Sequence, residues 1–244
     1  MVFEVLIVFA VLLLGSFLQG ASGFGFGLFA MSFLPFLFTV KDSTLLVVSL
    51  ALVTSLSIFI KVYKHIDLSK LLYLLSAAMI GRVCAFFILH HYGEMDILKK
   101  VLGFVLIGMV IYILTRKQSE GTVRKEKPLL PITLGYLGGL IGGVFVVGGP
   151  FFVFYFMVAC KDKYAYTANL QATFVITSVV TVVMHGFSGD FRSEFLIYFI
   201  VGVVSVIAGS RLGMKWFDRL SQANIKKIAS AVVAIAGLNL IIFS

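Results

Sequence analysis

The sequence predicts an all-α polytopic membrane protein with two inverted-topology repeats, each a glycine-broken helix hairpin followed by three transmembrane helices. Hydrophobic residues make up 60% of the 244 residues, whereas soluble domains contain roughly 45–50% apolar residues. Apolar stretches recur along nearly the whole chain, and about twenty such residues cross a bilayer core as a helix. The glycine-rich stretches of the two halves also resemble one another.

Ten apolar segments are expected to form the helices. They lie at residues 2–19, 24–40, 43–60, 67–90, 97–115, 129–147, 150–160, 165–187, 193–213 and 224–243. The polar stretch RKQSEGTVRKEKP divides the chain nearly in half. We therefore expect membrane repeat 1 at residues 1–115, a cytoplasmic linker at 116–128 and membrane repeat 2 at 129–244. The first twenty residues lack a basic lead-in, so we expect them to be mature structure and not a signal peptide.

An internal duplication is indicated by glycines that recur in the same order in both halves. Gly15, Gly20 and Gly25 align with Gly138, Gly143 and Gly148 at one constant offset. Further along, the pair Lys41-Asp42 resembles Lys161-Asp162, and Ile80-Gly81-Arg82 resembles Gly209-Ser210-Arg211. Order and position together favour duplication over chance matches in a glycine-rich chain.

The net charge of +9 comes from basic residues in short loops, a pattern that indicates membrane orientation and not nucleic-acid binding. If the chain turns back at GASGFGFG (20–27) and at GGVFVVGG (142–149), the loop lysines and arginines divide four against fifteen. If each stretch lies inside a continuous helix, they divide nine against ten. Only the first arrangement obeys the positive-inside rule. It predicts that both termini lie outside the cytoplasm.

The length of the helix after the second glycine stretch predicts re-entrant hairpins. Residues 150–160 reach only about 16 Å as a helix, roughly half of the hydrocarbon thickness. A repeat of one hairpin and three spanning helices crosses the membrane an odd number of times, so the second copy is inverted. The two tips are then expected to approach from opposite sides and to meet near the midplane.

Glycine tips that meet inside the membrane predict an anion-binding site. Each tip is followed by the start of a helix, where free backbone N–H groups and the positive end of the helix dipole attract negative charge. The competing interpretation is that the glycines serve close helix packing. The candidate substrate-binding residues at and near the tips are Gln19, Gly20, Ser22, Gly23, Gly25, Gly143, Gly148, Gly149, Asn169 and Gln171.

Arg82 is the one basic residue deep within a long apolar segment, and an arginine there should face the interior of the bundle. It is a further candidate substrate-binding residue, as an electrostatic partner of the anion. An alternative stays open, in which it bonds carbonyl groups freed at a glycine break. Its loose counterpart Arg211 lies closer to a segment end and is expected to be an interface anchor.

The acidic residues favour an anionic cargo. All eleven lie at or near predicted segment ends, whereas carriers of cations and protons usually retain a carboxylate within the membrane. The histidines His65, His90, His91 and His185 also lie at segment ends, where we expect interfacial placement. Cys84 and Cys160 have no metal-ligand or pairing pattern, and no cofactor or metal is predicted.

Three stretches resemble the TauE/SafE family of sulfite exporters in their order along the chain. They are GSFLQGASGFGFGLFAMSFLPFL, GGLIGGVFVVGGPFFVFY and GSRLGMKWFDRLSQANIKKIASAVVAIAGL. The resemblance implies a multi-pass protein of a prokaryotic cell membrane that exports sulfite or sulfonates such as sulfoacetate. The second stretch departs from the family's more usual all-glycine ending, because it has Pro150 and lacks glycine at Val146 and Val147.

Together these patterns predict a transporter that exports a small anion by alternating access, with the lipid bilayer and the anion as its partners and no nucleic acid. The alternatives are an anion channel and a carrier for a different small organic anion. An enzyme is not expected, because the sequence contains no HExxH, GxSxG or phosphate-loop motif.

Overall fold

The computed structural model describes residues 2–115, 129–160, 162–192, 195–216 and 222–243, and among them helices are the only regular structure. The α-helices are α1 (Val2–Ser22), α2 (Phe26–Phe33), α3 (Val40–Val62), α4 (Leu68–Tyr92), α5 (Ile97–Thr115), α6 (Leu129–Phe145), α7 (Gly149–Ala159), α8 (Lys163–Phe187), α9 (Phe195–Trp216) and α10 (Gln222–Phe243). Short 3-10 turns follow α2 (Leu34–Phe36) and α3 (Tyr63–His65). Each predicted segment corresponds to one helix, which confirms the all-helical expectation for these residues. The predicted linker at 116–128 lies outside them.

Polar side chains at the turns explain where several helices begin. Thr39 caps α3: its hydroxyl accepts a hydrogen bond from the backbone N–H of Asp42 and donates one to the Asp42 carboxylate. Asp67 caps α4 by accepting from the N–H of Ser69, and Asp162 caps α8 by accepting from the N–H of Ala165. Such caps satisfy N–H groups that have no partner within the helix.

Five helices of the described part of the chain are long and apolar enough to cross a membrane: α1, α3 with its following turn, α4, α8 and α9. The apolar helices α6 and α7, and α2 with its following turn, are shorter. A polytopic membrane protein is thereby confirmed. Since α1 alone has 21 residues, or about 31 Å as a helix, its length suffices for a full crossing, unlike that of α7 with 11 residues.

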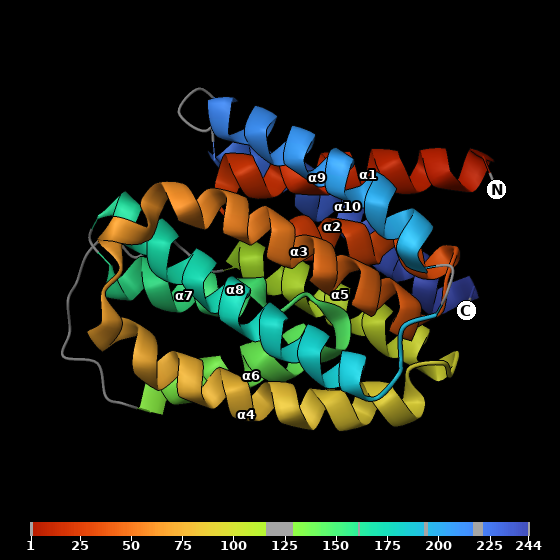
Figure 1. The fold of residues 1–244 in the computed structure, drawn as a ribbon, viewed down its shortest axis with the longest axis horizontal. Helices are drawn as coiled ribbons and strands as arrows, with labels where there is room; N and C mark the ends of the chain where they lie inside the picture. Colours follow the sequence, from red (N-terminus) through yellow and green to blue (C-terminus); the bar gives the residue numbers. More distant parts are fainter. Residues whose placement is uncertain (1, 116–128, 161, 193–194, 217–221, 244) are drawn as a thin grey trace.

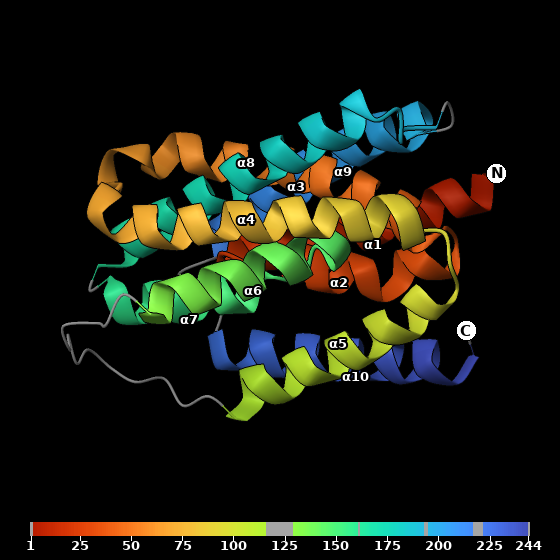
Figure 2. The ribbon, with the colours of Figure 1, turned by 90° about the horizontal axis from the view of Figure 1, so that it is seen from below.

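The helices lie roughly along one common direction, and both termini lie at the same end of the bundle, which we call the terminal end (Figure 1). The pairs that pack together are α1 with α9, α4 with α6, α3 with α8, and α5 with α10. Figure 2 shows the α5–α10 pair as a separate layer beneath the others. The hairpin of α1 and α2 starts from the terminal end, whereas α6 starts from the opposite end and α7 returns there (Figures 1 and 2).

The helices break inside both glycine stretches, but over only three residues of each. We call residues 23–25, between α1 and α2, the first tip, and residues 146–148, between α6 and α7, the second tip. Gly23 and Gly25 adopt φ angles of 84° and 110°, and Val146 adopts 57°, a region that side chains disfavour. The predicted segments place the breaks at residues 20–23 and 148–149, so the first tip lies a few residues later, and the second a few residues earlier, than predicted.

Close helix packing explains why the first half of each stretch stays helical. A Cβ atom on Gly20 would lie 2.4 Å from the carbonyl oxygen of Ser210 on α9. A Cβ atom on Gly143 would lie 2.3 Å from the Cβ of Ala85 on α4. These two glycines let helix backbones approach closely, so the packing interpretation applies to them.

Candidate functional site

The two tips lie against each other in the interior of the bundle. A Cβ atom added to Gly27, in the first turn of α2, would lie only 2.0 Å from the carbonyl oxygen of Val146. A Cβ atom added to Gly149 would lie 3.9 Å from the Cβ of Phe24. The hydroxyl of Thr44 on α3 donates to the carbonyl of Val144, just before the second tip, at 2.7 Å. Segments more than a hundred residues apart in sequence thus form one site.

A small cavity of about 30 Å³ lies where the tips meet. Both tips and the starts of α2 and α7 line it, together with side chains from α1, α3, α4 and α8. Its polar lining comes from Gln19, Ser55, Arg82 and Ser178, and its aromatic lining comes from Phe24, Phe26, Phe152 and Phe174. The cavity therefore offers hydrogen-bond donors on one part of its wall and aromatic carbon on another.

Amide side chains hold the first tip in place. Gln171 on α8 donates from Nε2 to the carbonyl oxygen of Gly23 at 2.9 Å. Gln19 on α1 donates from Nε2 to the hydroxyl of Ser55 at 2.9 Å and to Oε1 of Gln171 at 3.3 Å. Both glutamines are buried. Because a non-helical carbonyl inside a membrane protein must be satisfied by the protein or by water, the amide of Gln171 stabilises the break.

Arg82 lines this cavity from α4, and its side chain is buried. Its terminal nitrogens donate to the hydroxyls of Thr181, at 3.1 Å, and Thr177, at 3.4 Å. Its Nε atom has no hydrogen-bond partner among the described residues, and no carboxylate of the described chain pairs with it. A buried positive charge without an acidic partner is costly, so the site is suited to an anion.

The remaining predicted site residues divide between the cavity and its surroundings. Gly25, Gly148 and Gly149 line the cavity. Ser22 donates from its hydroxyl to the carbonyls of Leu18 and Phe24, at 2.8 Å each, so it supports the first tip from behind. Gly20 and Gly143 pack against neighbouring helices as described above.

Asn169 lies away from the cavity, near the start of α4. Its side-chain nitrogen donates to the carbonyl of Ala165 at 2.8 Å, and its side-chain oxygen accepts from the backbone N–H of Asp67 at 3.2 Å. These bonds satisfy the amide at the α4 cap, so the structure does not bring Asn169 together with the other predicted residues.

Sequence reasoning missed the hydroxyl groups of α8 and the residue Ser55. Residues at intervals of four lie on one face of a helix, and α8 carries such a stripe: Asn169, Thr173, Thr177, Thr181 and His185. All five are buried, and the middle of the stripe contacts Arg82. The four-residue spacing in an otherwise apolar segment was the signal that could have identified them. No comparable pattern marks Ser55.

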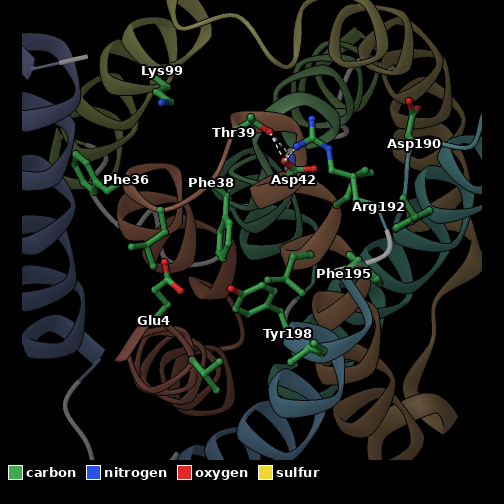
Figure 3. A pocket seen from close by; sticks show the side chains of 16 residues that line it. Glu4, Phe36, Phe38, Thr39, Asp42, Lys99, Asp190, Arg192, Phe195 and Tyr198 are labelled. Carbon is green, nitrogen blue, oxygen red and sulfur yellow. Dashed lines mark hydrogen bonds and ion pairs between the residues drawn. The ribbon is translucent and has the colours of Figure 1, made fainter. Parts of the chain in front are cut away.

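A second, larger cavity of about 690 Å³ opens at the terminal end (Figure 3). Its rim carries the ion pairs of Arg192 with Asp42, at 3.5 Å, and with Glu94, at 3.0 Å. Tyr198 and several phenylalanines also line it, and Figure 3 shows Phe38, Phe195 and Tyr198 around the opening. We call it the outer pocket.

Asp190 lines the outer pocket and forms a compact ionic cluster with three basic residues. Its carboxylate pairs with Lys41 on α3, with His90 on α4 and with His185 on α8. Burial acts to raise the pKa of Asp190, but the hydrogen bonds from these three residues lower it to about 2. The carboxylate is therefore ionised. His185 lies in the last turn of α8, at a segment end as predicted, and its side chain is fully buried.

Comparisons with known proteins extend over nearly the whole chain. The sequence model of the family described as "Sulfite exporter TauE/SafE" matches residues 7–240. A protein of Methanocaldococcus jannaschii described as a probable membrane transporter is 21% identical over 97% of this chain and 96% of its own length. A protein of Cupriavidus necator described as a probable sulfite/organosulfonate exporter TauE is 24% identical over 93% of this chain and 90% of its own. No solved structure matches the chain significantly.

Proposed function

The chain belongs to the TauE/SafE family of sulfite exporters, and we propose that it exports a small anion, a sulfur oxyanion or an organosulfonate, by alternating access around the two tips. The observation that carries this proposal is the contact of both tips with one cavity that also holds the buried, unpaired charge of Arg82. The relative from Cupriavidus necator, whose name includes sulfite and organosulfonate export, supports this class of cargo.

The chemistry of the cavity suits a sulfur oxyanion. The first N–H groups of α2 have no acceptor within that helix. In α7, Pro150 has no N–H and the N–H of Phe151 donates to the carbonyl of Gly148, which leaves that of Gly149 at the tip. The positive ends of both dipoles lie at the tips. Arg82 adds a full charge, and Gln19, Ser55 and Ser178 add neutral donors. An oxyanion has enough acceptor oxygens to bond several of these groups at once.

The packing pattern supports the inverted repeat. In a two-fold repeat, each of the helices α1–α5 corresponds in order to one of the helices α6–α10. Under this correspondence the α1–α9 pair becomes the α6–α4 pair, and the α3–α8 and α5–α10 pairs each map onto themselves. A two-fold axis between the halves would require this pattern. Gly20 packs against Ser210, while its counterpart Gly143 packs against Arg82 and Ala85. The two hairpins also start from opposite ends of the bundle (Figure 1). Under the positive-inside rule, this arrangement supports a terminal end that lies outside the cytoplasm.

The size of the cavity supports alternating access. A volume of about 30 Å³ holds about one or two water molecules, which is too little for a sulfonate with its shell of donors. The tips must therefore separate to admit the anion. Separation of the first hairpin would open the cavity toward one side of the membrane, and separation of the second toward the other, so the two hairpins act as paired gates.

Transport by the purified full-length protein in proteoliposomes tests this function. We expect saturable uptake of labelled sulfoacetate or sulfite. Uptake should accelerate when the same anion is present inside the vesicles, because the carrier then returns to the outside with an anion bound. Thiosulfate and taurine serve as further probes of charge and shape. No uptake of any of these compounds would refute the proposal, and a conductance of very many ions per opening would favour a channel.

A further inference from the structure

The Asp190 cluster holds a histidine whose second ring nitrogen is free. Nδ1 of His185 lies 2.7 Å from Oδ2 of Asp190. Because an ionised carboxylate can only accept, Nδ1 carries the hydrogen of this bond. Nε2 of the neutral ring is then a free base, and it has no hydrogen-bond partner among the residues that the structure describes. The ring is fully buried, so this base lies inside the protein and away from the surrounding water.

Charged and aromatic groups surround His185. Asp190 provides a negative charge that favours a proton on the ring, whereas burial of the ring and the positive charge of Lys41 oppose it. Lys41 and His90 bond the same carboxylate from α3 and α4. The ring of Phe86 on α4 lies 4.8 Å from the ring of His185, a distance at which an aromatic ring attracts a cation. A proton taken up at Nε2 would therefore charge a ring that contacts both a carboxylate and an aromatic ring.

The Asp190 cluster extends from His185 to the outer pocket. The side chain of His90 is 37% exposed and lies 3.0 Å from Asp190, and Asp190 lines the outer pocket. Figure 3 shows Asp190 at the side of this pocket, near Arg192. His90 and His185 both face this carboxylate with Nδ1, so the network connects the outer pocket to the Nδ1 side of His185, and a proton for Nε2 arrives from the opposite side of the ring.

The same histidine is connected to the anion cavity through α8 and α4. Thr181 lies one turn before His185, about 6 Å along the helix axis, and its hydroxyl accepts a hydrogen bond from Arg82. Phe86, which contacts His185, lies one turn after Arg82 on α4. The free base is thus one helical turn from the residues that hold the cationic side chain of the cavity.

We propose that His185 is a proton-binding site of the transport cycle, so that a proton and the anion cross the membrane in the same direction. This inference rests on the proposed function. A positive charge on His185 strengthens the attraction of the cavity for an anion, and by linkage the bound anion favours the proton equally. The proton-binding group is a histidine and not a carboxylate. This agrees with the sequence, in which every carboxylate lies at or near a segment end.

Proton movement in proteoliposomes tests this coupling. The full-length protein is reconstituted with a pH-sensitive dye inside, and potassium with valinomycin clamps the membrane potential. Sulfoacetate is then added outside at pH 7, where both of its acidic groups are ionised. We expect the wild-type protein to acidify the interior as sulfoacetate enters. His185→Asn should take up sulfoacetate without acidification, and its apparent affinity at pH 6 should be at least about fivefold weaker than that of the wild type.

His91→Gln is the matched control, because His91 is exposed beside the cluster and bonds only the carbonyl of Phe87; it should acidify like the wild type. Sulfoacetate uptake by the wild type without acidification, or with alkalinisation, would overturn the inference alone. Retained acidification in His185→Asn would also overturn it. No uptake of sulfoacetate, sulfite, thiosulfate or taurine by the wild type would overturn the proposed function and the inference together. If His185→Asn does not reach the membrane, a pH gradient imposed on the wild type decides: an acidic exterior must drive sulfoacetate accumulation.

Discussion

Replacement of Arg82 by glutamine is expected to weaken anion binding about 10-fold to 150-fold, which corresponds to the loss of one charge-assisted hydrogen bond worth about 1.5–3 kcal/mol. The free Nε and the two nitrogens that bond Thr177 and Thr181 are the charged donors of the cavity. The melting temperature of the variant in detergent should be equal to or above that of the wild type, since a buried charge without a carboxylate partner costs solvation energy.

The stability measurement separates the two interpretations of Arg82. If its role were structural, the variant would melt at a lower temperature and bind sulfoacetate normally. Arg211→Gln is the matched control, because Arg211 is its counterpart in the second half of the chain and its side chain is exposed; it should change neither quantity. Equilibrium binding of labelled sulfoacetate to purified protein measures the affinity, and an unchanged affinity in Arg82→Gln would remove this residue from the site.

Replacement of Gly27 by alanine is expected to reduce sulfoacetate uptake at least about tenfold while membrane insertion stays normal. The added methyl group would lie 2.0 Å from the carbonyl oxygen of Val146, so the tips could no longer approach as they do. Overpacking of this kind costs about 1–3 kcal/mol, and here the cost applies only to the conformation in which the tips meet. A carrier that must pass through that conformation is slowed accordingly.

Gly108→Ala is the control for this experiment, because a Cβ atom on Gly108 would meet no atom within 4 Å. Its uptake should equal that of the wild type at the same protein level. Normal uptake by Gly27→Ala would show that close contact of the tips is not needed for transport. A substitution at Gly148 is less informative, since its Cβ would lie 2.0 Å from the carbonyl of Gly138 within the same hairpin and would disturb the packing of α6 with α7.

The sequence was sufficient to predict the helices and the approximate positions of the breaks. Apolar stretches long enough to span a membrane have few alternatives to helix, because backbone groups in lipid must bond within the chain. Glycine marked the first tip because Gly23 and Gly25 adopt positive φ angles, whereas in the second tip the positive φ belongs to Val146. It could not mark their exact limits, because Gly20 and Gly143 serve helix packing, which a single sequence does not distinguish from a turn.

The partners of individual polar side chains could not be predicted. Gln171 and Asn169 are two residues apart on α8, so they face different directions, and only the packed neighbours decide which one reaches a tip. The same limit applies to His185 and Asp190, whose pairing with Lys41 and His90 requires the ends of three helices to converge. Long-range packing, and not local pattern, assigns these roles.

The contact between the tips can be tested directly with a reversible crosslink. Phe24 and Gly149 are both replaced by cysteine in a background where Cys84 and Cys160 are alanine. The two Cβ positions are 3.9 Å apart, which matches the usual separation across a disulfide, about 3.8 Å. We predict that oxidation links the tips and stops sulfoacetate uptake, and that a reductant restores it. Failure of the disulfide to form, or full uptake by the oxidised protein, would contradict the claim that two tips meet at one anion site and must separate for transport.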